Sequence, residues 1–173
     1  SGMVGLTCAL ELIKKHPKAK SLILEKGMLP QGASTKNAGF ACFGSLSELI
    51  DDLNSHTEDE VFNLVKKHWE RLQLLRQNLC DATIDFQQNK GFELFKNQAL
   101  FENYLSKKDE INKLLKPIFK EDVFSVSDNI FGFQKVHQKY IVNHFEGQID
   151  TGKMASQLLL KAQKNGIKIL NNI

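Results

Sequence analysis

The chain has 173 residues, of which 42% are hydrophobic and 25% are charged, a composition typical of a globular domain that can bury its own core. Its 23 basic and 20 acidic residues leave a net charge of +3, with lysines scattered among acids, which argues against a nucleic-acid partner. The longest apolar runs are about half a dozen residues, too short for the about 20 residues of a membrane span.

Cysteine usage indicates the compartment. Cys8, Cys42 and Cys80 form no CxxC pair and are odd in number, which fits free thiols in a reducing environment better than a disulfide framework. We therefore expect a cytoplasmic protein. An upstream signal peptide stays an open question, because the sequence starts at Ser1 without an initiator methionine.

The first 25 residues predict a glycine turn, a helix and a strand. Gly2 and Gly5 open an amphipathic run, residues 21–24 form a short apolar run that we interpret as a buried parallel strand, and Glu25 closes it. A dinucleotide pyrophosphate binds at a helix N-terminus, where glycine lets the backbone come close. An acid at the end of the next strand can accept hydrogen bonds from ribose hydroxyls. The order of these parts predicts a dinucleotide site.

This fingerprint is incomplete. A further glycine would stand two residues before Gly2, and a strand would precede it. We therefore expect a fragment whose natural start lies upstream, and whose end is also cut because Ile173 follows a strand without a termination signal. We expect the fragment alone to fold poorly and to bind little cofactor.

The next segment, residues 28–45, is rich in small residues and reads MLPQGASTKNAGFACFGS. Its glycines and alanines let a backbone pass close to another group, while residues 34–37 offer hydrogen-bond donors. One interpretation is a long surface loop, and the other is a loop that lies along a bound cofactor. Cys42 lies inside this segment, and we interpret it as a small buried hydrophobic residue rather than a redox thiol.

The glycine turn, the strand ending in LILEKG and the GASTKNAGF segment together resemble the N-terminal part of the D-amino-acid-oxidase-like family of FAD-dependent oxidoreductases, which includes glycine and sarcosine oxidases. The resemblance implies FAD, bound non-covalently because no His or Cys matches a covalent attachment. It implies Gly2 and Gly5 at the pyrophosphate, Glu25 at the adenosine ribose, and residues 34–39 on the flavin side. The implied cofactor-binding residues are Gly2, Met3, Gly5, Glu25, Lys26, Ser34, Thr35, Asn37, Ala38, Gly39 and Phe40.

Residues 45–79 predict two consecutive helices. Ser45 with Glu48, and Thr57 with Glu60, have the spacing of capping boxes, and apolar residues follow each at helical intervals. His68 falls in the second apolar stripe, which predicts a core or boundary histidine. Trp69 is expected to anchor the packing.

The middle of the chain predicts a mixed segment. Alternating residues around 83–95 suggest a hairpin, residues 98–115 a helix that ends before Pro117, and residues 131–142 a strand. The family resemblance implies that such an antiparallel insertion forms the substrate-side domain. Tyr104 and Tyr140 could reach a substrate, but we interpret both hydroxyls as structural.

Residues 150–173 return to the opening pattern. Asp150 or Thr151 can cap a helix, Gly166 can end it, and residues 167–170 predict a strand. The predicted fold is therefore α/β: a Rossmann-like FAD-binding βαβ sheet, partial and without its first strand, with an inserted α+β substrate-side domain. The expected boundaries are 1–45 and 148–173 for the FAD-binding part, 46–82 for a helical segment and 83–147 for the insertion.

The chemistry implied by the resemblance is hydride removal from an amine, amino acid or hydroxy acid. A substrate carboxylate would favour a bidentate arginine, but Arg71 and Arg76 are expected on a solvated helix face, so the catalytic residues stay unknown. His137 and His144 lack partners at metal-ligand spacing, so no metal is expected. The oligomeric state is not indicated.

Two other functions remain open at this point. An NAD-dependent dehydrogenase would use the same turn and acid, although the GASTKNAGF segment argues against a direct crossover of the NAD type. A non-catalytic chain could keep the fold as an interaction subunit.

Overall fold

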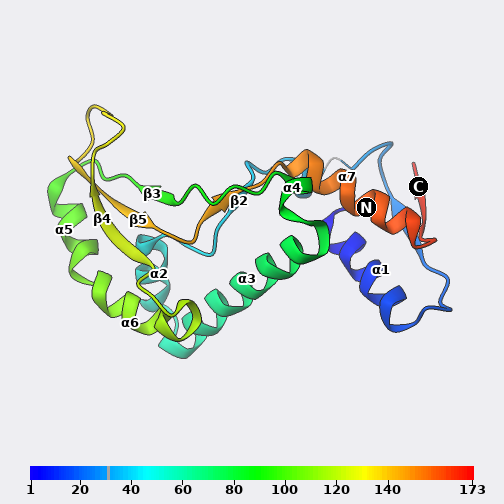
Figure 1. Cartoon of the computed structure of the whole chain (residues 1–173), viewed down its shortest axis with the longest axis horizontal. Coiled ribbons are helices and arrows are strands. Elements are labelled where there is room, and N and C mark those ends of the chain that lie inside the picture. Colours follow the sequence, from blue (N-terminus) through cyan, green and yellow to red (C-terminus); the bar gives the residue numbers. More distant parts are fainter. Residues whose placement is uncertain (31) are drawn as a thin grey trace. The chain divides into compact units, whose positions relative to one another are not determined.

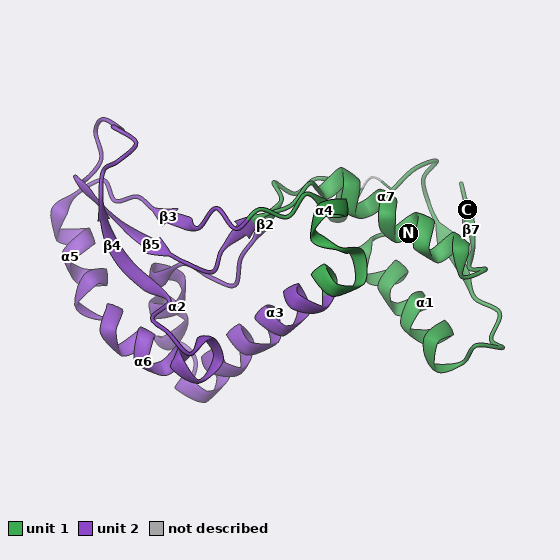
Figure 2. Ribbon diagram, viewed as in Figure 1, with its two compact units in different colours: residues 1–40, 75–87, 148–173 green, residues 41–74, 88–147 purple. Residues whose placement is uncertain are grey.

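The computed structural model describes residues 1–30 and 32–173, which form two compact units (Figure 1). Unit 1 comprises residues 1–40, 75–87 and 148–173, and unit 2 comprises residues 41–74 and 88–147 (Figure 2). The chain therefore leaves unit 1 and returns to it twice. Residues far apart in sequence meet in each unit, and each unit has its own apolar core.

Unit 1 is built on a parallel strand pair with helices. Its elements are α1 (Met3–Lys15), β1 (Leu22–Glu25), the 3₁₀ turn η1 (Ala33–Thr35), α4 (Asp81–Ile84), α7 (Thr151–Lys164) and β7 (Lys168–Asn171). β1 pairs with β7 in parallel, from Leu22 opposite Lys168 to Glu25 opposite Asn171. The expected parallel strands at the two ends of the sequence are confirmed.

The core of unit 1 lies between α1 and α7. The inward stripe of α1 supplies Leu6 and Ala9, and that of α7 supplies Met154, Leu158 and Ala162. These residues meet because a helical repeat of 3.6 places every third or fourth side chain on one face. The centre of each apolar stripe is thereby removed from water, while Leu10, Ile13 and Leu159 at its border are partly buried.

The boundaries of α7 follow from its sequence. The Asp150 side chain accepts a hydrogen bond from the Lys153 N–H at 2.9 Å, so Asp150 caps the helix. Gly166, with a φ of +74°, follows the last turn in the left-handed conformation that glycine adopts freely. Both expectations are confirmed.

The prediction of a buried strand at residues 21–24 is wrong. Leu22 and Leu24 are 53% and 59% exposed, whereas Ile23 packs against the core of unit 1. Successive side chains of a strand point to opposite faces, and in the described structure only one face of β1 is covered by that core. β1 is therefore half-buried.

Unit 2 places helices on an antiparallel sheet. Its helices are α2 (Leu46–Leu53), most of α3 (Glu58–Leu79), α5 (Gln98–Ser106) and α6 (Lys108–Phe119). The strands β3 (Gly91–Glu93), β5 (Lys139–Asn143) and β4 (Phe124–Asp128) form a sheet in that order. The short strands β2 (Phe40–Ala41) and β6 (Gly147–Gln148) form a separate ladder.

Both predicted capping boxes are present. Ser45 and Glu48 exchange their side-chain and backbone hydrogen bonds at the start of α2, and Thr57 and Glu60 do so at the start of α3. Trp69 anchors the core as expected, because its ring lies 5.0 Å from that of Phe119 and 5.7 Å from that of Phe145. His68 is exposed, so its expected core position is wrong.

Three expectations for the middle of the chain are wrong. The expected hairpin at 83–95 does not form, because residues 81–84 are helical and β3 pairs with β5. The expected helix at 98–115 is two helices separated at Lys107, and the second runs through Pro117 to Phe119. The expected strand at 131–142 covers only Lys139–Asn143.

Among the described residues, no helix combines the length and the apolar character that crossing a bilayer requires.

Candidate cofactor-binding site

The N-terminus of α1 presents backbone donors. Gly2 is the residue before its first turn and has no side chain to cap it, and no acidic residue lies in that turn. The N–H groups of a first helical turn have no acceptor within the helix. Met3 N–H donates to the Ser34 hydroxyl at 3.0 Å, so η1 is held against the start of α1.

The glycines of this turn have different surroundings. A Cβ on Gly2 would lie 3.1 Å from the Ser34 hydroxyl oxygen, so the close approach of η1 favours glycine there. A Cβ on Gly5 would have no protein atom within 4 Å. A glycine in a helix costs up to about 1 kcal/mol relative to alanine, and no packing in the described residues requires one at this position. The space beside Gly5 is therefore open in the described structure.

Glu25 lies at the carboxyl end of β1, as predicted. Its carboxylate accepts hydrogen bonds from the Ser1 amino group, from the Ser1 hydroxyl at 2.8 Å and from the Gly27 N–H at 3.2 Å. Glu25 is therefore a hydrogen-bond acceptor beside the start of α1.

The segment after η1 is organised by its own side chains. The Thr35 hydroxyl donates to the Gly32 carbonyl at 3.1 Å. The Asn37 amide donates to the Ser34 carbonyl at 3.1 Å and accepts from the Gly39 N–H at 3.0 Å. Such local bonds are typical of Asx and ST turns, and they fix the course of this loop.

Gly39 is required by the protein itself. Its φ is +81°, and a Cβ would overlap the Ile149 carbonyl oxygen, while its own carbonyl accepts from the Ile149 N–H at 2.9 Å. Glycine adopts this φ without strain. Backbone packing therefore accounts for Gly39 without a cofactor.

The remaining predicted residues are at the surface of unit 1. Lys26 and Ala38 are exposed, and Phe40 is 78% exposed. The structure thus brings Gly2, Met3 and Ser34 into contact and ties Asn37 to Ser34 and Gly39. It leaves Lys26, Ala38 and Phe40 on the surface.

A small pocket adjoins the start of α1, and α7 contributes to it. Met3 and Leu6 of α1, Ser34 and Thr35 of η1, and residues 154, 155, 158 and 159 of α7 line it. The sequence motifs do not indicate these α7 residues as site candidates. Their helical spacing predicts only that they point inward, and the contact with η1 arises from tertiary packing.

Several other candidate residues have structural roles. The Arg76 guanidinium binds Asp81 with two hydrogen bonds, of 2.9 and 2.7 Å, and stacks on Phe86, so its expected solvated position is wrong. Tyr140 is buried and its hydroxyl donates to Asn129. His137 stacks on Phe101. Cys42 is exposed, which corrects the expectation of a buried thiol.

The arrangement fits an extended anionic ligand. The positive end of α1 favours an anion such as phosphate, and Glu25 places a carboxylate acceptor beside it. These are the parts that an FAD molecule needs for its diphosphate and adenosine ribose.

Comparison with known proteins identifies what the chain resembles. The family model described as FAD-dependent oxidoreductase matches residues 1–173. No curated protein matches the chain.

Similar solved structures include L-amino acid deaminase from Proteus vulgaris, with a TM-score of 0.67 and 16% identity over 99% of this chain and 38% of that one. Glycine oxidase from Geobacillus kaustophilus has a TM-score of 0.59 and 18% identity over 99% of this chain and 44% of that one. L-alpha-glycerophosphate oxidase from Mycoplasma pneumoniae has a TM-score of 0.64 and 18% identity over 99% of this chain and 42% of that one. The chain spans about 40% of the length of these proteins, and the likeness shows a shared mixed α/β fold.

Proposed function

This chain belongs to the family of FAD-dependent oxidoreductases, and from that membership we propose that it binds FAD through unit 1 in a protein that oxidises an amine, amino acid or related hydroxy acid. Bound FAD would supply the acceptor for the hydride that leaves the substrate carbon. The chain's own contribution is to hold and orient the cofactor.

One observation carries this proposal. The Ser34 hydroxyl meets the Met3 N–H at 3.0 Å, which joins the glycine turn and the small-residue segment on one surface. If these two segments lay apart, they could not bind a single elongated cofactor.

The proposed roles follow the contacts. Gly2, Met3 and Gly5 would hold the diphosphate at the positive end of α1, and Glu25 with Lys26 would lie at the adenosine ribose. Residues 34–40 would run toward the flavin ring. Binding would be non-covalent.

The names of similar proteins support the substrate class. They include an amino acid deaminase and a glycine oxidase, which are named after amino acids. They also include a glycerophosphate oxidase, which is named after a compound that bears a hydroxyl group. We extend this class to the present chain as part of the proposal. Residues 1–45 and 148–173 would form a Rossmann-like FAD-binding part, residues 46–82 a helical segment and residues 83–147 the substrate-side insertion, in a cytoplasmic protein.

The test separates binding from folding. Gly5→Ala adds a methyl group where no protein atom lies within 4 Å, so its melting temperature should equal or exceed that of the wild type. The same methyl group would obstruct the diphosphate, so we expect the Kd for FAD to rise by about tenfold or more. FAD fluorescence titration of the protein at its full natural length measures the Kd, and Gln163→Ala on the exposed surface of α7 should leave it unchanged.

Two results would contradict the proposal. The first is equal FAD affinity of the wild type and Gly5→Ala, which would place the diphosphate elsewhere. The second is that the wild type binds NAD in preference to FAD, or neither of them, in parallel titrations.

A further inference from the structure

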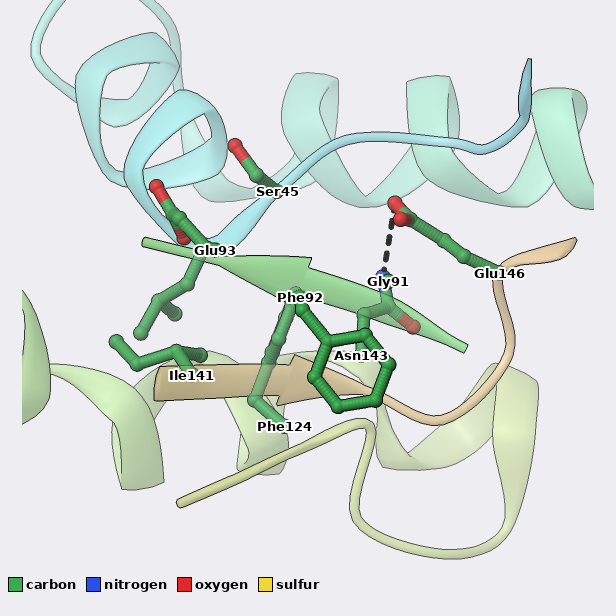
Figure 3. Close-up of a pocket in the computed structure, with 9 residues that line it drawn as sticks. Ser45, Gly91, Phe92, Glu93, Phe124, Ile141, Asn143 and Glu146 are labelled. Carbon is green, nitrogen blue, oxygen red and sulfur yellow. Dashed lines mark hydrogen bonds between the residues drawn. The ribbon is translucent and has the colours of Figure 1, made fainter. Parts of the chain in front are cut away.

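The N-terminus of α2 in unit 2 gathers carboxylates from three segments. Glu48 closes the capping box with Ser45, accepting from the Ser45 N–H at 2.8 Å. Glu93 of β3 accepts from the Ser47 hydroxyl and from the Ser47 N–H at 3.4 Å. Glu146 comes from the turn after β5 and lines the same pocket as Ser45 and Glu93 (Figure 3).

Glu146 is packed against the backbone of β3. Figure 3 shows its side chain directed toward Gly91, and a Cβ on Gly91 would overlap the Glu146 carboxylate. The Asn143 amide, which is 4% exposed, donates to Glu146 Oε1 at 3.2 Å and to the Gly44 carbonyl at 3.4 Å. The Glu146 carboxylate thus occupies the space that a side chain at position 91 would fill. The buried Asn143 amide donates both to Glu146 and to the segment before α2.

No basic side chain compensates this cluster within residues 1–30 and 32–173. None of the three carboxylates forms an ion pair there with lysine, arginine or histidine. The titratable groups that face Glu146 are Glu48 of α2, Glu93 of β3 and Cys42 of the segment before α2. All of these groups are acidic, so their ionised forms repel one another.

Burial raises the carboxyl pKa values, as this repulsion does. Burial first, and then the charges of Glu48 and Glu93, raise the pKa of Glu146 from 4.5 to about 7, whereas the hydrogen bond from the Asn143 amide lowers it. Burial also raises the pKa of Glu93, partly offset by its bonds to Ser47. One carboxyl group of the cluster is therefore protonated just below neutral pH.

We propose that the cluster of Glu48, Glu93 and Glu146 is a proton-operated switch in unit 2. A protonated Glu146 stays packed on Gly91 beside β3. When it ionises, repulsion from the other two carboxylates and the favourable hydration of its charge move its side chain toward water. The pocket then opens and the seam between β3 and the start of α2 loosens.

The sign of the pH dependence follows from linkage. The carboxyl group of Glu146 has a higher pKa in the folded chain than in the unfolded chain. Its protonation therefore stabilises the folded state fully below about pH 4.5, and this stabilisation is lost as the pH rises through about 7. Between about pH 5 and pH 8 the folding equilibrium constant of unit 2 should fall by up to about a hundredfold.

The experiment is denaturant unfolding of the full chain across this pH range. The wild type should lose stability toward about pH 8, whereas Glu146→Gln, which cannot ionise, should be nearly level and the more stable of the two at about pH 8. Glu121→Gln, an exposed acid of the same unit, should retain the wild-type slope. An equal slope in the wild type and Glu146→Gln would overturn the proposal.

A second measurement does not depend on the variant folding. Hydrogen exchange of the wild type, corrected for the intrinsic pH effect, should show protection of residues 91–93 that falls between about pH 6 and pH 8, with α6 unchanged. Protection of β3 that is independent of pH would also overturn the proposal.

Discussion

Gly5 and Gly39 have different surroundings within the candidate site. Gly39 has a φ of +81° and a carbonyl oxygen in the place of a Cβ, so the fold requires glycine there. Gly5 has open space beside it and no such requirement from the described protein. A substitution at Gly39 would therefore disturb the backbone whether or not FAD binds, whereas the described protein leaves room for a side chain at Gly5.

Cys80 has a backbone conformation that suits glycine. Its φ is +67° and its ψ is 132°, and it lies between α3 and α4 where Arg76 binds Asp81. A side chain in this region of backbone conformation costs of order 1–3 kcal/mol, which the surrounding contacts must offset. The side chain of Cys80 is exposed, so it contributes little packing in return.

We predict that Cys80→Gly stabilises the protein by about 1 kcal/mol, because it relieves this strain at an exposed position. The melting temperature should rise by about 2–4 °C. Cys80→Ala is the matched control, since it removes the thiol but keeps the strained Cβ, and it should melt close to the wild type. If Cys80→Gly melts at or below Cys80→Ala, the strain at this turn is not significant.

At the scale of elements, α6 and β4 are joined by one buried amide. Asn112 of α6 is 3% exposed, and its carbonyl oxygen accepts from the N–H groups of Val123 at 3.0 Å and Phe124 at 2.8 Å. Its amide nitrogen donates to the Phe124 carbonyl at 2.9 Å. The side chain thus satisfies three backbone groups at the point where the chain turns from helix to strand.

We expect Asn112→Ala to destabilise unit 2 by about 3 kcal/mol, because it leaves buried donors and an acceptor without partners. Urea unfolding monitored by Trp69 fluorescence measures this loss, since Trp69 lies in the core of the same unit. Lys113→Ala, the exposed neighbour on α6, should change the stability by less than about 0.5 kcal/mol. Similar losses for both variants would show that Asn112 is not the connecting residue.

At the scale of the molecule, the two units have separate cores, and the candidate FAD site lies within unit 1. A ligand that binds only the folded form of one unit stabilises that unit by mass action. ADP contains the adenosine diphosphate half of FAD without the flavin, so its proposed contacts are confined to unit 1.

We therefore predict that saturating ADP slows hydrogen exchange in residues 1–40 and 148–173 and leaves α5 and α6 of unit 2 unchanged. Gly5→Ala should reduce this protection at the same ADP concentration. Protection that appears in unit 2 alone would contradict the proposed position of the diphosphate.

The family could be recognised from the sequence because its motifs are short and continuous. The glycine turn, the strand ending at Glu25 and the GASTKNAGF segment together indicated an FAD-dependent oxidoreductase, and the family match over the whole chain confirms it. The hydrogen bond between Met3 and Ser34 spans 31 residues and could not be predicted in the same way. The roles of the individual site residues stay predictions.

Features that depend on neighbouring residues could be predicted from the sequence. The starts of α2, α3 and α7 and the end of α7 follow from Ser45, Thr57, Asp150 and Gly166, because a cap or a left-handed turn acts within a few residues. Only the tertiary structure decided the partner of β3, the half-burial of β1, the binding of Arg76 to Asp81 and the approach of Glu146 to Gly91. Each of these depends on packing or pairing that goes beyond the local pattern, so local propensity and periodicity did not specify it.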